Sequence, residues 1–169
     1  MRGGKIWGML AALVVAMPAA AEPPASGQFI RAVLGVHNAA RRDAGVPDLQ
    51  WDTSLAEDAQ AWADHLAETG RFEHSQARKG EGENLFMGTA DGYSYEEMVR
   101  YWVAEGRNFT NGTFPAISTN GQWSSVGHYS QIVWRDTTRV GCAIASGGGE
   151  DYLVCRYSPP GNVWGRRAF

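Results

Sequence analysis

Two histidines and two glutamates are the side chains of this chain whose types and positions could do chemistry. His74 and Glu83 lie in a long stretch without a regular pattern, and His128 opens the segment GHYSQIVW. Glu105 falls at helical spacing after two apolar residues, which places a carboxylate where it needs a cation, a donor or a metal. Two neutral imidazoles and a carboxylate make a partial zinc-type ligand set. We expect His74 and His128 to bind a divalent metal (zinc, or magnesium or calcium), with Glu83 and Glu105 near it.

Three interpretations of these four side chains stay open. In the first, the cleft binds a metal but the protein requires no cofactor. In the second, a bound metal activates water for peptide or ester hydrolysis, with Glu83 or Glu105 as general base. Such metal-dependent hydrolases normally use three protein ligands, and two histidines are a weak set. A Ser-His-Glu arrangement that uses Ser130 as the nucleophile is disfavoured as well, because the chain has no nucleophile-elbow motif. In the third, two Glu–His pairs only hold loops in place. The sequence favours binding over catalysis.

Three helices and a small sheet must position these side chains. The expected helices run from Ser26 to Gly45, from Asp52–Ser54 (with Ser54 and Glu57 as a capping box) to Gly70, and onward from Ser94. The segment from Gly127 to Cys142 alternates large side chains on both faces, which predicts a strand, a polar turn and a second strand. A strand that is apolar on both faces needs cover on both sides, so we predict a layered α/β domain. The stretches 71–93 and 106–126 read as long irregular connections.

The N-terminal residues and the net charge indicate where the protein works and which partners are not expected. Residues 1–21 combine a basic start, a short apolar run and a small-residue ending, which predicts a Sec signal peptide cleaved after Ala21. We therefore expect a secreted or periplasmic protein with no transmembrane segment and a single domain over residues 22–169. The formal net charge is −3, and no block of basic residues occurs. Nucleic acid is therefore not an expected partner.

Two cysteines, Cys142 and Cys155, are the only ones in the chain. In an exported protein such a pair favours a disulfide over a metal site or a reactive thiol. If Gly148 and Gly149 form a two-residue hairpin turn, Cys142 falls opposite Cys155 on the neighbouring strand. Directly opposed strand residues are within disulfide reach, so we predict this bond.

Four segments resemble one protein family. GHYSQIVWRDT (127–137) and YLVCRYSPPGNV (152–163) are similar to the two signatures of the CAP superfamily, which comprises cysteine-rich secretory, antigen-five and pathogenesis-related proteins. HNAARRDAGVPDLQWD and GENLF also resemble family segments, so the similarity spans nearly the whole chain beyond the signal peptide. The resemblance implies a three-layer α-β-α sandwich with a small antiparallel sheet.

The resemblance also implies a site and partners. It places His74, Glu83, Glu105 and His128 in one cleft and gives His37 a structural role, which we also assign to Asn162. A lipid or sterol, or a protein partner, is implied as a ligand. The loop before the GHY segment lacks the cysteines typical of plant members, and the cysteine-rich extension of mammalian members is absent. We also expect a bacterial source, in which the two Asn-X-Thr sequons of the chain would be unused.

Overall fold

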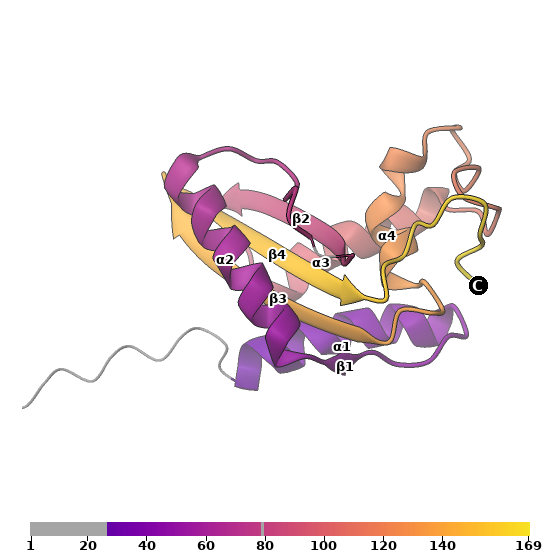
Figure 1. Cartoon of the computed structure of the whole chain (residues 1–169), viewed down its shortest axis with the longest axis horizontal. Coiled ribbons are helices and arrows are strands. Elements are labelled where there is room, and N and C mark those ends of the chain that lie inside the picture. The colour runs from indigo at the N-terminus through magenta and orange to yellow at the C-terminus, as the bar shows by residue number, and fades with distance from the viewer. Residues whose placement is uncertain (1–26, 79) are drawn as a thin grey trace, which may run out of the picture.

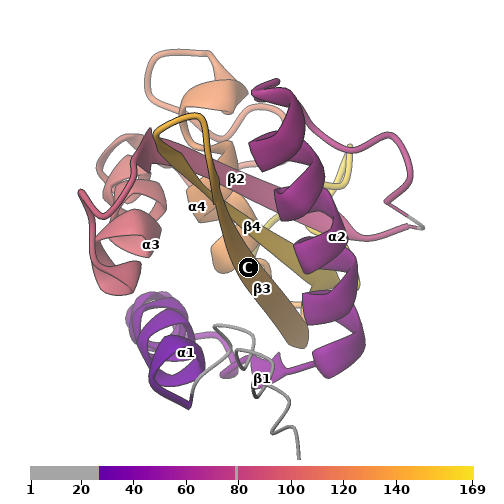
Figure 2. The ribbon, with the colours of Figure 1, turned by 90° about the vertical axis from the view of Figure 1, so that its left-hand side faces the viewer.

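A small sheet lies between two helical layers (Figures 1 and 2). The computed structural model describes residues 27–78 and 80–169, so the predicted signal peptide lies outside the described residues. Four strands pair in the order β1-β3-β4-β2, and their bounds are β1 Gln50–Trp51, β2 Gly82–Thr89, β3 Arg139–Gly147 and β4 Glu150–Ser158. Strands β2, β4 and β3 are antiparallel, while the two-residue β1 runs parallel to β3. The predicted α-β-α sandwich is confirmed, with β1 as a short parallel addition.

Four α-helices cover the two faces of the sheet: α1 Gly27–Asp43, α2 Thr53–Thr69, α3 Tyr95–Ala104 and α4 Gly127–Ile132. Helix α2 alone covers one face, and α1, α3 and α4 lie on the other (Figure 2). The core on the α2 side is small and built mainly from alanine, leucine and valine, while the other side buries large aromatic residues, including Phe29, Trp102 and Trp134. None of the helices in residues 27–78 and 80–169 is long and apolar enough to cross a membrane.

Local sequence signals set the helix ends. Gly45, with φ of 70°, lies just beyond α1, and Gly70 closes α2 in the left-handed conformation, as expected. Ser94 caps the N-terminus of α3 and forms the expected capping box with Glu97. The expected box at the start of α2 is replaced by a different cap. Asp52 lies before the helix and its Oδ1 accepts hydrogen bonds from two backbone N–H groups, at 2.9 and 3.1 Å.

The predicted hairpin and disulfide are both confirmed. Gly148 and Gly149 have φ of 63° and 88°, the positive values that a tight two-residue turn between strands requires. The register that follows places Cys142 directly opposite Cys155, and the two sulfurs are bonded. Both cysteines are buried, so the disulfide joins β3 to β4 inside the core.

The prediction that the segment from Gly127 forms a strand is wrong. Residues 127–132 form helix α4, and the first strand after it begins only at Arg139. The alternation of large side chains on both faces arises because this short helix is buried nearly all round, a pattern that periodicity alone does not distinguish from a buried strand. The carboxylate of Glu105 accepts hydrogen bonds from the backbone N–H groups of His128 and Tyr129, which stabilises the first turn of the helix.

The prediction that residues 71–93 lack regular structure is also wrong in part. Residues 82–89 form β2, which pairs with β4 along its whole length at one edge of the sheet. Its sequence, GENLFMGT, has no strict alternation and two glycines, so the partner strand rather than local propensity determines the strand. Gly82 is required by a close approach, because a Cβ atom there would lie 2.1 Å from Oε1 of Gln131.

A buried arginine joins α1 to the segment that follows α4. The guanidinium of Arg41 donates hydrogen bonds to four backbone carbonyls, those of Pro47, Ile132, Trp134 and Thr137. The side chain has no solvent exposure, and burial lowers the pKa of Arg41 to about 10, so that it stays charged at neutral pH. Arg41 thereby closes the C-terminal end of α4 and fixes the helix that carries His128.

Candidate functional site

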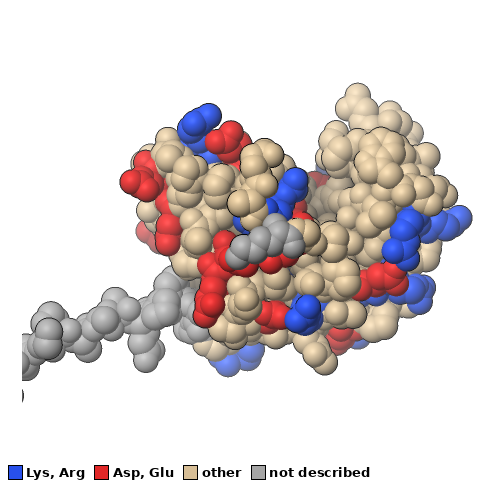
Figure 3. Space-filling view, viewed as in Figure 1, with Lys and Arg blue, Asp and Glu red and all other residues tan. Residues whose placement is uncertain are grey.

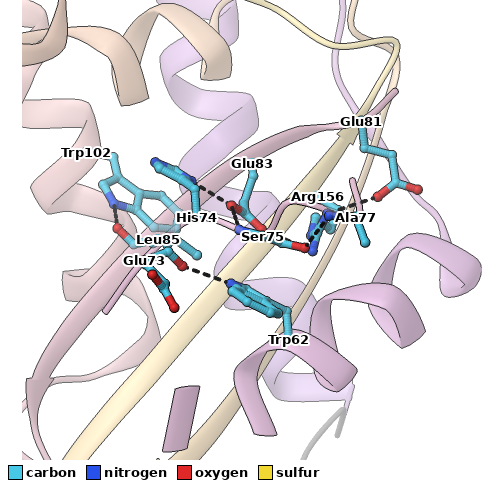
Figure 4. Close-up of polar contacts among 10 residues, drawn as sticks. All are labelled: Trp62, Glu73, His74, Ser75, Ala77, Glu81, Glu83, Leu85, Trp102 and Arg156. Atoms are coloured by element: carbon cyan, nitrogen blue, oxygen red, sulfur yellow. Dashed lines mark hydrogen bonds and ion pairs between the residues drawn. The ribbon is translucent and has the colours of Figure 1, made fainter. Parts of the chain in front are cut away.

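His74 and Glu83 form the first of two Glu–His pairs (Figure 4). Nδ1 of His74 lies 2.6 Å from Oε1 of Glu83, and the backbone N–H of Ser75 donates to the same oxygen at 3.1 Å. The other carboxylate oxygen, Oε2, lies 3.0 Å from Nη2 of Arg156. The Glu83 side chain is fully buried, whereas half of the His74 side chain is exposed. Strand β2 and the buried Arg156 of β4 therefore hold a fixed carboxylate behind an imidazole that reaches solvent.

His128 and Glu105 form the second pair. Nδ1 of His128 lies 2.7 Å from Oε1 of Glu105, whose Oε2 accepts from the backbone N–H of His128 at 3.0 Å. The imidazole of His128 also stacks on the indole of Trp102, with ring centroids 5.8 Å apart and planes 23° from parallel. Glu105 is the C-cap residue of α3, so this pair joins the end of α3 to the start of α4. The sequence predicts that the Glu105 carboxylate, on the apolar face of its helix, needs a hydrogen-bond donor or a cation. Residues at the start of α4 donate these hydrogen bonds.

Both pairs determine which imidazole nitrogen can bind a ligand. A carboxylate oxygen accepts hydrogen bonds, so Nδ1 of each ring carries the proton that it donates. In the neutral ring the lone pair then belongs to Nε2, and no described residue forms a hydrogen bond with Nε2 of His74 or of His128. A carboxylate behind Nδ1 is the usual arrangement behind a metal-binding histidine, because it fixes the tautomer and makes Nε2 more basic.

Strand β2 connects the two pairs. Glu83 belongs to the first, and the side-chain amide of the next residue, Asn84, donates to the His128 carbonyl at 3.2 Å. The indole N–H of Trp102, which stacks on His128, donates to the Leu85 carbonyl at 3.1 Å. Three successive residues of β2 thus contact His74, His128 or the ring beside His128.

The structure brings each histidine to one glutamate, but it does not gather the four side chains into a closed ligand set. Within residues 27–78 and 80–169, no three His, Cys, Asp or Glu side chains are grouped so that they could hold a metal ion. A cleft of about 610 Å³ is lined by His74 and Glu83 but not by His128 or Glu105. Each pair therefore offers one imidazole nitrogen, Nε2, on a ring whose Nδ1 is bonded to a carboxylate.

A chain of buried polar residues connects α1 to the second Glu–His pair. The sequence alone did not identify two of these residues, Asn84 and Tyr157. His37 lies in α1 with Nδ1 2.8 Å from the Val33 carbonyl and Nε2 2.9 Å from the Tyr157 hydroxyl. Asn84 donates to the same hydroxyl at 3.1 Å and to the His128 carbonyl. This buried chain of contacts runs from α1 through β4 and β2 to the second pair. Asn84 and Tyr157 lie inside the GENLF and YLVCRYSPPGNV segments, which was the available signal.

Ser130 lies in α4 and Asn162 in the segment after β4, and neither takes part in a Glu–His pair. The Asn162 side-chain amide donates to the Gly127 carbonyl at 2.9 Å, which ties the C-terminal segment to the start of the helix. Asn162 has φ of 56°, a left-handed conformation that asparagine adopts more readily than most residues. Ser130 is fully buried, and its hydroxyl has no hydrogen-bond partner among the described residues. No Ser-His-Glu arrangement is therefore formed.

A sandwich with these signatures and paired Glu–His side chains defines a class of protein. The profile of the CAP, cysteine-rich secretory protein family matches residues 34–157, and the chain belongs to this family. Pathogenesis-related protein 1C of Nicotiana tabacum is 39% identical over 137 residues, which cover 80% of this chain and 78% of the relative. The secreted protein RBT4 of Candida albicans is 37% identical over 141 residues, 82% of this chain and 37% of that protein. These plant and fungal relatives do not support the expected bacterial source.

Solved structures with the same fold agree. A crystal structure of NaASP2 with Zn2+ has a TM-score of 0.73 and 27% identity, with 85% of this chain and 86% of that chain covered. MpPR-1i has a TM-score of 0.56 and 26% identity, with 79% and 89% covered. The fold of this chain is therefore the fold of these proteins.

Proposed function

We propose that this protein is a secreted CAP-domain protein that binds a divalent metal, zinc in the first place, through Nε2 of His74 and Nε2 of His128. The observation that carries the proposal is that both histidines have Nδ1 bonded to a carboxylate, at 2.6 and 2.7 Å, so that each has Nε2 available. Imidazole nitrogen is a preferred zinc ligand, and the two carboxylates stand where outer-shell partners of such ligands stand. The crystal structure of NaASP2 with Zn2+, which shares this fold, supports the same choice of metal.

Three observations support secretion. The first 21 residues have the composition of a signal peptide, and the relatives include a protein named as secreted. A buried disulfide also fits an oxidising compartment. We therefore place the metal site outside the cytoplasm.

The two glutamates would orient the imidazole rings of the histidines rather than act on a substrate. Glu83 is fixed by Arg156 and by the Ser75 N–H, so it can orient the ring of His74 but is not free to turn toward a substrate. Glu105 is occupied in the same way by the start of α4. A metal at Nε2 would supply Lewis acidity and an anchor for a donor atom of a ligand. With both glutamates engaged and no third protein ligand grouped with the histidines among the described residues, the arrangement favours binding over the hydrolase alternative.

A lipid is the second candidate ligand, and one cleft favours it. About 510 Å³ of space lies over β3 between α1 and α2, with Phe29, Ile30 and Trp51 in its lining. Few polar groups face this space, and an apolar chain placed there would leave little polar surface unpaired. This cleft is separate from both Glu–His pairs, so lipid binding and metal binding would be independent.

Zinc titration of the purified chain, followed by calorimetry, tests the proposal. We expect wild-type protein to bind one zinc ion and His74→Ala or His128→Ala to weaken binding about 100-fold, because each removes one of two imidazole ligands. The matched control is His65→Ala, since His65 stacks on Trp62 in α2 and belongs to neither pair.

Equal zinc affinity in the wild type and both variants would contradict the proposal. If the wild type binds no zinc and the same substitutions instead lower the thermal unfolding temperature, the pairs have only a structural role. Circular dichroism of each variant before titration separates loss of fold from loss of binding.

A further inference from the structure

Two exposed tryptophans stand at one wall of the cleft beside His74. Trp164 is 69% exposed and Trp123 is 42% exposed, and both line the cleft of about 610 Å³. An indole can bury about 150–250 Å² of surface, so leaving two of them open to water at the same cleft calls for an explanation. Neither residue contacts His74 or His128 among the described contacts.

The tryptophans are held by a buried ring between them. Phe114 is 3% exposed, and its ring centroid lies 5.2 Å from that of Trp123 and 5.4 Å from that of Trp164. Two backbone hydrogen bonds, from Phe114 N to the Arg166 carbonyl and from Gly165 N to the Phe114 carbonyl, join the loop to the C-terminal segment. At the other end, a Cβ atom on Gly127 would approach the Trp123 ring to 3.3 Å. We call Phe114, Trp123 and Trp164 the aromatic platform; it is positioned before any ligand arrives.

The two walls of the cleft differ in chemistry. The lining residues on the side of the aromatic platform include no charged residue, and Figure 3 shows an uncharged surface on the right of the hollow in the upper edge of the molecule. The opposite wall, which precedes and begins β2, carries hydrogen-bonding side chains, among them Gln76 and Arg78. The volume lies within the range of about 300–1,000 Å³ that small-ligand clefts occupy.

A ligand for this cleft must be flat and apolar on one face and rich in hydrogen-bonding groups on its edges. A pyranose ring has this character, because its C–H face can stack on an indole while its hydroxyls point outward. A sterol or an acyl chain would instead press apolar surface against the polar wall and leave buried polar groups unpaired. We propose that the aromatic platform binds a neutral oligosaccharide, stacked on Trp164 and Trp123.

The test uses the full secreted chain and three linear probes: hexasaccharides of β-1,4-linked glucose, β-1,3-linked glucose and β-1,4-linked N-acetylglucosamine. Tryptophan fluorescence and calorimetry would measure the affinity of each. We expect at least one probe to bind, Trp164→Ala to weaken it about tenfold and Trp164→Phe to weaken it less, because phenylalanine keeps a stacking face. Tyr101→Ala is the matched control, since Tyr101 is 56% exposed on α3 and does not line the cleft.

Three results would overturn the proposal. The first is no binding of any probe at up to about 10 mM. The second is binding that Trp164→Ala leaves unchanged. The third is Trp164-dependent binding of a fluorescent sterol or of a peptide in place of all three saccharides. Zinc titration of Trp164→Ala should match the wild type, so failure of this proposal and failure of the metal site are separate outcomes.

Discussion

Replacing Arg41 with alanine should lower the free energy of unfolding by about 4 kcal/mol or more. Four backbone carbonyls receive hydrogen bonds from this one fully buried guanidinium, and an alanine side chain can donate none. The Trp134 carbonyl also accepts a hydrogen bond from the Thr137 N–H and keeps it in the variant. Each carbonyl that is left unpaired costs about 1–3 kcal/mol, so the total is large for a single substitution. Because two of the carbonyls, those of Ile132 and Trp134, follow the turn that carries His128, zinc affinity should fall as well.

Urea unfolding of Arg41→Ala and Arg42→Ala measures this effect with a neighbouring control. Arg42 forms an exposed ion pair with Asp48 at 2.9 Å, and its side chain is 60% exposed. Such pairs contribute about 0–1 kcal/mol, so Arg42→Ala should be nearly neutral. Similar small losses in the two variants would show that Arg41 does not hold the fold as described.

Acidification from pH 6.5 to pH 4 should remove about 3 kcal/mol of stability through His37 alone. Burial lowers the pKa of His37 to about 4, against 6.5 in an unfolded chain, while the hydrogen bond to Val33 works in the opposite direction and nearby Arg41 adds to the lowering. The unfolded state therefore binds more protons than the folded state between these two pH values. The contribution is fully present above pH 6.5 and is lost progressively as the pH falls to 4.

The variant His37→Gln isolates this contribution, because glutamine can replace both hydrogen bonds but does not titrate. The stability of the wild type should fall more steeply than that of the variant between pH 6.5 and 4, as measured by urea unfolding at intervals of pH. All other ionisable groups are the same in both proteins, so the difference between the two curves reports on His37. Parallel curves for the two proteins would show that His37 is protonated without cost to the fold.

Much of the fold follows from short-range signals in the sequence. The capping box at Ser94, the helix stop at Gly70 and the turn at Gly148–Gly149 each depend on a few adjacent residues. The disulfide follows in turn from the register of that hairpin. These elements could be predicted because the residues that determine them are neighbours along the chain.

The elements that were predicted wrongly depend on distant residues. Helix α4 has no capping side chain of its own and relies on the carboxylate of Glu105 for its first turn and on Arg41 for its last. Strand β2 forms because β4 lies beside it. No local pattern contains this information, since propensity is a weak guide where tertiary contacts supply the hydrogen bonds.

The candidate site was likewise predictable in part: its residues could be identified from the sequence, but their contacts could not. The types of its four side chains identified them as a group, whereas the pairing of His74 with Glu83 and of His128 with Glu105 needed the structure. The stacking of Trp102 on His128 and the contact of Asn84 with the His128 carbonyl likewise depend on packing between α3, α4 and β2. The sequence alone did not indicate which of the many polar residues would take these positions.

Crystals soaked in zinc and measured at the zinc absorption edge test the central claim most directly. We predict one strong anomalous peak about 2.1 Å from Nε2 of His74 and from Nε2 of His128, with both Glu–His hydrogen bonds retained behind the rings. A peak bound to only one histidine, a peak at another site, or zinc coordinated by Nδ1 with the carboxylates displaced would contradict the account.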